Sequence, residues 1–203
     1  MYPTFKRILD AVGSLVILIV LAPLLVLVAL LVLLVDGRPV FFQQIRPGLH
    51  EKPFLIVKFR TMSAGPAADD GDESARLTKL GKMLRTTSID ELPSLWNIVR
   101  GDMSFVGPRP LLVGYLGIYS RRHAQRHAVR PGLTGLAQVA GRNLVSWEKK
   151  LDMDVEYVEN FSFWLDMKIL LKTFVEVIRI RGIDQADGST MPRLAAGYDS
   201  DWS

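Results

Sequence analysis

Two adjacent acids, Asp90 and Glu91, stand at the start of an apolar pattern that predicts a short helix. The helix dipole favours ionised carboxylates at that end. An ionised carboxylate can attack phosphorus as a covalent nucleophile, and its oxygens are ligands that Mg²⁺ accepts. Acids also cap helices at this position, and capping is the commoner explanation for an isolated pair. The pair alone therefore does not assign a chemistry.

Basic side chains on strand-forming or turn-rich backbone accompany these acids. They are Lys58, Arg60, Arg85, Arg109 between two prolines, and Arg142 in a glycine-rich loop. Cations on such backbone are pre-organised for phosphate oxygens, and phosphoryl transfer depends mostly on positioning and charge neutralisation. Lys58 and Arg60 share one face of a predicted strand and could converge on one anion, although a solvated face is an equally good explanation. Together the acids and cations favour a phosphoryl-transfer site.

The start of the helix that carries the acids has two alternatives. Ser88 and Glu91 match a capping box, but this register places Pro93 beyond the first turn, where proline is poorly tolerated. Asp90 as the N-cap places Pro93 at the third helical position, which is easier to accommodate. In both cases Gly101 is the expected end of the helix.

An apolar segment near the amino terminus must position this site relative to a membrane. Residues 11–35 carry no charged side chain and are long enough, as a helix, to cross a hydrocarbon core of about 30 Å. Pro23 removes a backbone donor and favours a kink. Basic residues lie on both sides, Lys6 and Arg7 before it and Arg38 and others after it, and such flanks prefer the cytoplasmic side. Residue patterns alone leave a spanning and a re-entrant helix equally favoured.

The remaining pattern predicts a mainly helical chain with a small β-hairpin. Residues 40–45 and 54–60 read as the two strands, and residues 111–128, 147–158 and 165–180 as helices. The basic cluster in residues 121–130 is expected to face lipid headgroups rather than to bind a metal through its two histidines.

Composition limits the function classes. The chain has 203 residues, a formal net charge of +4 and no cysteine, so disulfides, thiolate metal sites and cysteine nucleophiles are excluded. A basic chain with a long apolar segment favours an anionic membrane surface or phosphorylated substrates as partners, and not nucleic acid.

Five motifs in series resemble the bacterial sugar transferases, also called monotopic phosphoglycosyl transferases. The motifs are KRILDAVGSLVILIVLAPLLVLVALLVLL, KFRTM, TSIDELPSLWNIVRGDMSFVGPRP, RPGLTGLAQVAGRN and FSFWLDMKILLKT, in this order within residues 5–182. The chain looks like the minimal form of the family. It departs from the family pattern at Ala22, where a serine usually precedes the proline, and at Ala140, where the family loop commonly has asparagine.

This resemblance implies a topology. Residues 1–36 are expected to form a re-entrant helix that is broken at Ala22 and Pro23 and packs on a cytosolic α/β catalytic domain, residues 37–182. Residues 183–203 form a tail. The expected location is the bacterial inner (cytoplasmic) membrane, with the catalytic domain facing the cytosol.

The resemblance also implies a ping-pong reaction. Asp90 attacks a UDP-sugar, UMP leaves, and a polyprenyl (undecaprenyl) phosphate then takes the phosphosugar from Asp90. Asp90 and Glu91 are expected to hold Mg²⁺. The expected phosphate or carboxylate contacts come from Lys58, Arg60, Arg85 and Arg109, with Arg142 on the nucleotide side.

Two other functions remain open: a membrane-anchored glycosyl transferase that releases UDP, and a membrane-anchored basic binding module without enzymatic activity. Residues 188–194 (GSTMPRL) are similar to an element of relatives that use acetamido sugars, which favours a UDP-N-acetylated amino sugar over UDP-glucose or UDP-galactose. A homodimer is compatible with the sequence.

Overall fold

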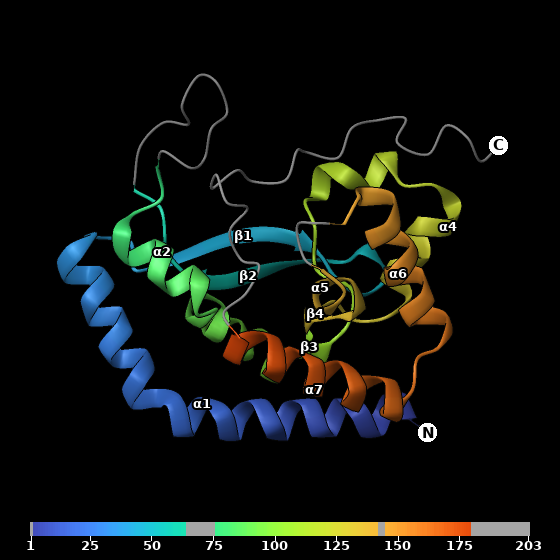
Figure 1. Ribbon diagram of the computed structural model, residues 1–203, viewed down its shortest axis with the longest axis horizontal. Helices are drawn as coiled ribbons and strands as arrows, with labels where there is room; N and C mark the ends of the chain where they lie inside the picture. The colour runs from blue at the N-terminus through green and yellow to red at the C-terminus, as the bar shows by residue number, and fades with distance from the viewer. Residues whose placement is uncertain (1, 64–75, 142–144, 180–203) are drawn as a thin grey trace.

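The protein is described by a computed structural model over residues 2–63, 76–141 and 145–179 (Figure 1). Residue 142 and the predicted tail, residues 183–203, lie outside this range. The α-helices are α1 (Tyr2–Val35), α2 (Lys79–Thr86), α3 (Leu95–Arg100), α4 (Arg121–Ala124), α5 (Leu136–Val139), α6 (Trp147–Glu159) and α7 (Phe163–Arg179). Short 3-10 helices are η1 (Leu49–Glu51), η3 (Ile89–Ser94), η4 (Val113–Ile118) and η5 (Gln125–Ala128).

Two small sheets lie among these helices. Strands β1 (Phe41–Pro47) and β2 (Pro53–Phe59) form the predicted hairpin, with Phe41 opposite Phe59. Strands β3 (Ser104–Val106) and β4 (Gly132–Thr134) form a parallel pair that the sequence analysis missed. Three-residue strands are too short to show an alternating pattern, so the prediction of a single hairpin was incomplete.

Helix α1 contains Pro23 in its interior and is bent, as Figure 1 shows. Its first part runs beside α7 and its last part turns toward α2. In the described part of the chain, α1 is the one helix long and apolar enough to cross a membrane, and most of its apolar stretch is exposed. An interior proline is the usual cause of such a bend.

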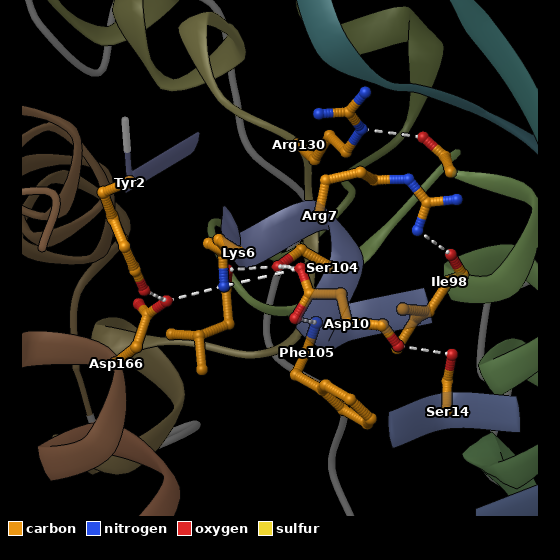
Figure 2. Close-up of polar contacts among 12 residues, drawn as sticks. Tyr2, Lys6, Arg7, Asp10, Ser14, Ile98, Ser104, Phe105, Arg130 and Asp166 are labelled. Carbon is orange, nitrogen blue, oxygen red and sulfur yellow. Dashed lines mark hydrogen bonds and ion pairs between the residues drawn. The ribbon is translucent and has the colours of Figure 1, made fainter. Parts of the chain in front are cut away.

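The first part of α1 is attached to the rest of the protein by buried polar contacts (Figure 2). Lys6 Nζ lies 2.6 Å from the Asp166 carboxylate of α7, and Asp10 accepts a hydrogen bond of 2.7 Å from the Ser104 hydroxyl of β3. Arg7 donates to the backbone carbonyls of Ile98 and Val99 at the end of α3. Of the two cationic residues predicted to flank a membrane segment, Lys6 is therefore paired with carboxylates of the protein, and Arg7 is hydrogen-bonded to its backbone.

The last part of α1 is attached through apolar side chains. Val28 and Val32 are buried against Phe59 of β2 and Leu84 of α2. Both parts of the bent helix therefore contact the same folded unit, which also carries the two sheets.

The segment before β4 differs from its prediction. Residues 111–128 form three short helices, η4, α4 and η5, instead of one helix. Three side chains of the predicted lipid-facing cluster are buried: His123, Arg126 and His127. Arg126 forms an ion pair of 2.7 Å with Asp154 of α6. The prediction of a lipid-facing basic surface was wrong for these residues. For Arg126 the reason is that α6 supplies a counter-charge from a distant part of the sequence.

Candidate active site

The two acids lie in η3, which joins α2 to α3. The residue before η3, Ser88, has a left-handed backbone (φ 57°), and its side chain forms no capping hydrogen bond. Ser88 is nevertheless the residue before the first turn, as the first alternative predicted, whereas Asp90 is not the N-cap: Asp90 and Glu91 both lie in the first turn, which is a 3-10 helix and not an α-helix. Pro93 lies inside this turn and donates no backbone hydrogen bond, because proline has no N–H group. Helix α3 ends at Gly101 (φ 91°) as predicted.

Glu91 is held by two cations. Its Oε1 atom accepts from Lys58 Nζ at 2.6 Å and from Arg109 Nη2 at 2.8 Å. Burial acts to raise the pKa of Glu91, but the charges of Arg109 and Lys58 outweigh it and hold this pKa well below its usual range. Glu91 is therefore an ionised side chain with a fixed position.

Asp90 is in a different electrostatic environment. Only 8% of the residue is exposed, and burial together with the charge of Glu91 raises its pKa to about 6. Lys58, Arg85 and Arg109 act in the opposite direction. Within the described residues, no donor is hydrogen-bonded to the Asp90 carboxylate. Asp90 is therefore the acid of the pair whose oxygens are available to react or to bind a cation.

A cavity opens beside Glu91. Its charged lining consists of Arg46, Lys58, Glu91 and Arg109. Arg46 was not among the predicted site residues. It lies opposite Phe54 in the hairpin, so it shares a sheet face with Lys58. The pairing register across the turn at residues 47–53 is the signal that could have identified it.

Of the other predicted cations, the structure describes Arg85 and Arg60 but not Arg142. Arg85 donates through Nε to the Thr61 hydroxyl at 3.0 Å and acts electrostatically on Asp90. Arg142 lies outside the described residues. Arg60 is buried, and its guanidinium donates to the backbone carbonyls of residues 36–38 at the end of α1.

The expectation that Arg60 and Lys58 converge on one anion is not met in this structure. Strand β2 ends at Phe59, so the alternation of side chains does not extend to Arg60. Arg60 instead connects the end of α1 to the hairpin.

Replacing Arg60 with alanine should lower stability without removing the active site. The carbonyls of residues 36–38 would lose a charged donor, and an unsatisfied buried group costs about 1–3 kcal/mol. Thermal unfolding of the purified protein in one detergent should show a lower Tm for Arg60→Ala. The exposed Arg38→Ala variant is the control and should unfold near the wild-type temperature. An unchanged Tm for Arg60→Ala would contradict this role.

Asp90 and Glu91 are also the residues whose chemistry fits a magnesium ion. The described residues contain no group of three His, Cys, Asp or Glu side chains that could enclose a metal. Mg²⁺ commonly binds through one or two carboxylates and completes its shell with water and substrate phosphates. Burial, and after it the charge of Glu91, raises the pKa of Asp90, and a divalent cation bound beside it would favour the ionised carboxylate.

Comparisons with known proteins identify the family. The family model for bacterial sugar transferases matches residues 1–180. The chain is 46% identical to a Bacillus subtilis protein named an uncharacterized sugar transferase, EpsL, over 96% of this chain and 97% of that protein. It is 43% identical to a UDP-glucose:undecaprenyl-phosphate glucose-1-phosphate transferase of Caulobacter vibrioides, over 83% of this chain and 67% of the relative.

A third relative, the exopolysaccharide production protein ExoY of Sinorhizobium fredii, is 38% identical over 87% of each chain. The family match and these identities confirm the resemblance inferred from the motifs. They also confirm that the protein is an enzyme and not a non-enzymatic binding module. This chain belongs to the bacterial sugar transferase family.

Proposed function

We propose that the protein transfers a sugar phosphate from a UDP-sugar to undecaprenyl phosphate and releases UMP. The names of several relatives state this type of reaction with UDP-glucose. The observation that carries the proposal for this chain is the contrast within the acid pair. Glu91 is fixed by Lys58 and Arg109, whereas the Asp90 carboxylate has a raised pKa and no donor among the described residues.

In the first step, an Asp90 oxygen attacks the sugar-linked phosphorus of the UDP-sugar. An Asp90–phosphorus ester bond forms, the bond from that phosphorus to the bridging oxygen breaks, and UMP leaves with the electron pair. Lys58, Arg85 and Arg109 all act electrostatically on Asp90, so they also lie where charge develops during this step.

In the second step, a phosphate oxygen of undecaprenyl phosphate attacks the same phosphorus. The ester bond breaks, Asp90 leaves as a carboxylate, and the product is undecaprenyl-diphosphate sugar. One phosphoanhydride is exchanged for another, so the reaction needs no further energy source. When bound to Asp90 and Glu91, Mg²⁺ would neutralise phosphate charge in both steps.

The donor that we propose is UDP-glucose or UDP-galactose. The names of relatives that state a donor give UDP-glucose or UDP-galactose. The alternative of an acetamido sugar depends on residues 188–194, which lie outside the described residues.

The nucleotide product tests the reaction class. Incubated with undecaprenyl phosphate and UDP-glucose, UDP-galactose or UDP-N-acetylglucosamine in turn, the protein should release UMP with at least one of the first two donors. Release of UDP instead would mean attack at the anomeric carbon, and would support an ordinary glycosyl transferase.

We also propose that α1 is re-entrant, with the catalytic domain on the cytosolic side of the bacterial inner membrane. A helix that crosses a core of about 30 Å places its two ends on opposite sides. Here Lys6 contacts Asp166 near one end, and Val32 packs against the same folded unit near the other. The bend in α1, with Pro23 in its interior, allows both contacts (Figure 1).

Single-cysteine labelling tests this topology directly, because the protein contains no cysteine. Cysteines placed at the exposed positions Thr4 and Arg38 flank the apolar segment. In intact cells a membrane-impermeant maleimide should label neither position, and after permeabilisation it should label both. Labelling of one position alone in intact cells would support a spanning helix.

A further inference from the structure

The cavity beside Glu91 carries an excess of positive charge. Its lining includes the cations Arg46, Lys58 and Arg109 but a single carboxylate, Glu91. One oxygen of Glu91 already accepts from both Lys58 and Arg109. Arg46 reaches the same region from β1, where its Nη1 atom lies 3.4 Å from the carbonyl oxygen of Pro110. Such a lining suits an anion that brings at least one negative charge.

Most of the remaining lining is apolar. It includes Ile56, Met103, Leu111 and Leu133, together with Pro110, Gly132 and the polar Ser94. Ile56 lies on the same strand face as Lys58, so apolar and cationic side chains are neighbours in this lining. Ile56 and Met103 are buried members of the cluster against which Leu18 of α1 packs. The apolar part of the lining is therefore continuous with the core that contacts α1.

From this juxtaposition we propose that the cavity binds the phosphate end of the acceptor, with Arg46 contacting the phosphate and the first prenyl unit lying along Ile56, Met103, Leu111 and Leu133. This proposal rests on the proposed function and adds to it a binding residue and the location of the acceptor. Arg46 acts here as a substrate-binding residue that takes no part in the attack on the UDP-sugar.

The two substrates differ in the groups next to their phosphates, and this difference indicates which of them fits the cavity. A polyprenyl phosphate joins its phosphate directly to hydrocarbon, so cations and apolar side chains must lie side by side in its site. In a UDP-sugar, polar hexose and ribose flank the diphosphate on both sides, and an apolar wall beside the phosphates would leave their hydroxyl groups without partners. The lining beside Arg46 matches the first arrangement.

The ping-pong sequence allows the two substrates to be measured independently. The first half-reaction is followed as the burst of UMP from UDP-glucose without acceptor, and the full reaction as turnover with increasing undecaprenyl phosphate. Arg46→Ala should raise the KM for undecaprenyl phosphate about tenfold or more, because a hydrogen bond to a charged group is lost. The UMP burst and the KM for UDP-glucose should stay within about twofold of wild type.

Two further variants sharpen the test. Arg46→Lys keeps the charge and should recover part of the acceptor affinity. Arg100→Ala removes a cation from an exposed side chain outside the cavity and should leave both half-reactions unchanged. Leu133→Asn should raise the KM for undecaprenyl phosphate while leaving the UMP burst intact, because it replaces part of the apolar lining with a polar side chain.

Each contrary outcome has a distinct meaning. If Arg46→Ala abolished the UMP burst or raised the KM for UDP-glucose equally, the cavity would bind the donor diphosphate and the acceptor proposal would be wrong. If no kinetic constant changed, the cavity would not be a substrate site. If wild-type protein gave no UMP burst with any UDP-sugar, the proposed function itself would fail, independently of Arg46.

Discussion

Replacing Asp90 with asparagine is expected to abolish turnover, by at least about a thousandfold, since loss of a covalent nucleophile has effects of this size or larger. Asparagine has nearly the same shape but a neutral amide that cannot form the phosphosugar ester. Mass spectrometry of wild-type protein incubated with UDP-glucose alone should find a hexose-phosphate adduct on the peptide that contains Asp90. The same experiment with Asp90→Asn should find none, and no UMP burst.

Stability measurements separate this loss from misfolding. Burial and the charge of Glu91 raise the pKa of Asp90 to about 6, so its favourable contribution to stability is present below the pKa of the unfolded state and is lost as the pH rises through about 6. At pH 7 without divalent cations, Asp90→Asn should therefore unfold at the wild-type Tm or above it. The control Asp102→Asn removes a carboxylate just after the end of α3, the helix that follows the acid pair, and should retain activity. Near-normal turnover of Asp90→Asn would show that another group is the nucleophile.

Local patterns predicted those parts of the fold that depend on neighbouring residues. The apolar run, the alternation in the hairpin and the glycine that ends α3 each act through backbone geometry within a few residues, and the structure contains all three. The family followed from long motifs in series, and the comparisons confirm it. These features need no knowledge of which distant segments meet.

Features that depend on distant contacts were missed or misread. The Ser104 hydroxyl and Asp10 are 94 positions apart, and nothing near either residue indicates that they meet. Arg126 was expected at the surface because its partner, Asp154, belongs to another helix. Arg46 enters the cavity only because the hairpin register aligns it with Lys58. The type of a residue determines which kinds of partner it can bind, and tertiary packing determines which of them lies within reach.

The largest effect on stability is expected where α1 meets α7. Lys6 is buried, and its ammonium lies 2.6 Å from Asp166 and 3.6 Å from Asp10 (Figure 2). It is the cation between two buried carboxylates. Lys6→Met keeps the length of the side chain but leaves both acids without it. Removing one partner of a buried ion pair costs about 3–5 kcal/mol, so the Tm of the detergent-solubilised protein should fall by several degrees or more.

Replacing Asp166 tests the charge balance among Lys6, Asp10 and Asp166, and a smaller loss of stability is expected. Asp166→Asn alone leaves Lys6 paired with Asp10, and the amide oxygen can still accept from the Tyr157 hydroxyl, which lies 2.7 Å from Asp166. Burial and the charge of Asp166 raise the pKa of Tyr157, so this hydroxyl remains a donor. Asp166→Asn should therefore cost less than Lys6→Met, and adding it to Lys6→Met should restore part of the lost Tm by removing one uncompensated charge.

The exposed Lys52→Met variant makes the same chemical change outside the cluster and should leave the Tm unchanged. If Lys6→Met unfolded at the wild-type temperature, the polar contacts of α1 would contribute little to its attachment, and the apolar packing of Val28 and Val32 would hold the helix in place. If Lys6→Met were unstable and Asp166→Asn made it worse, the cluster would be held by hydrogen bonds to Asp166 rather than by charge compensation. The double variant thus shows whether charge compensation or hydrogen bonding to Asp166 attaches the first part of α1 to the catalytic domain.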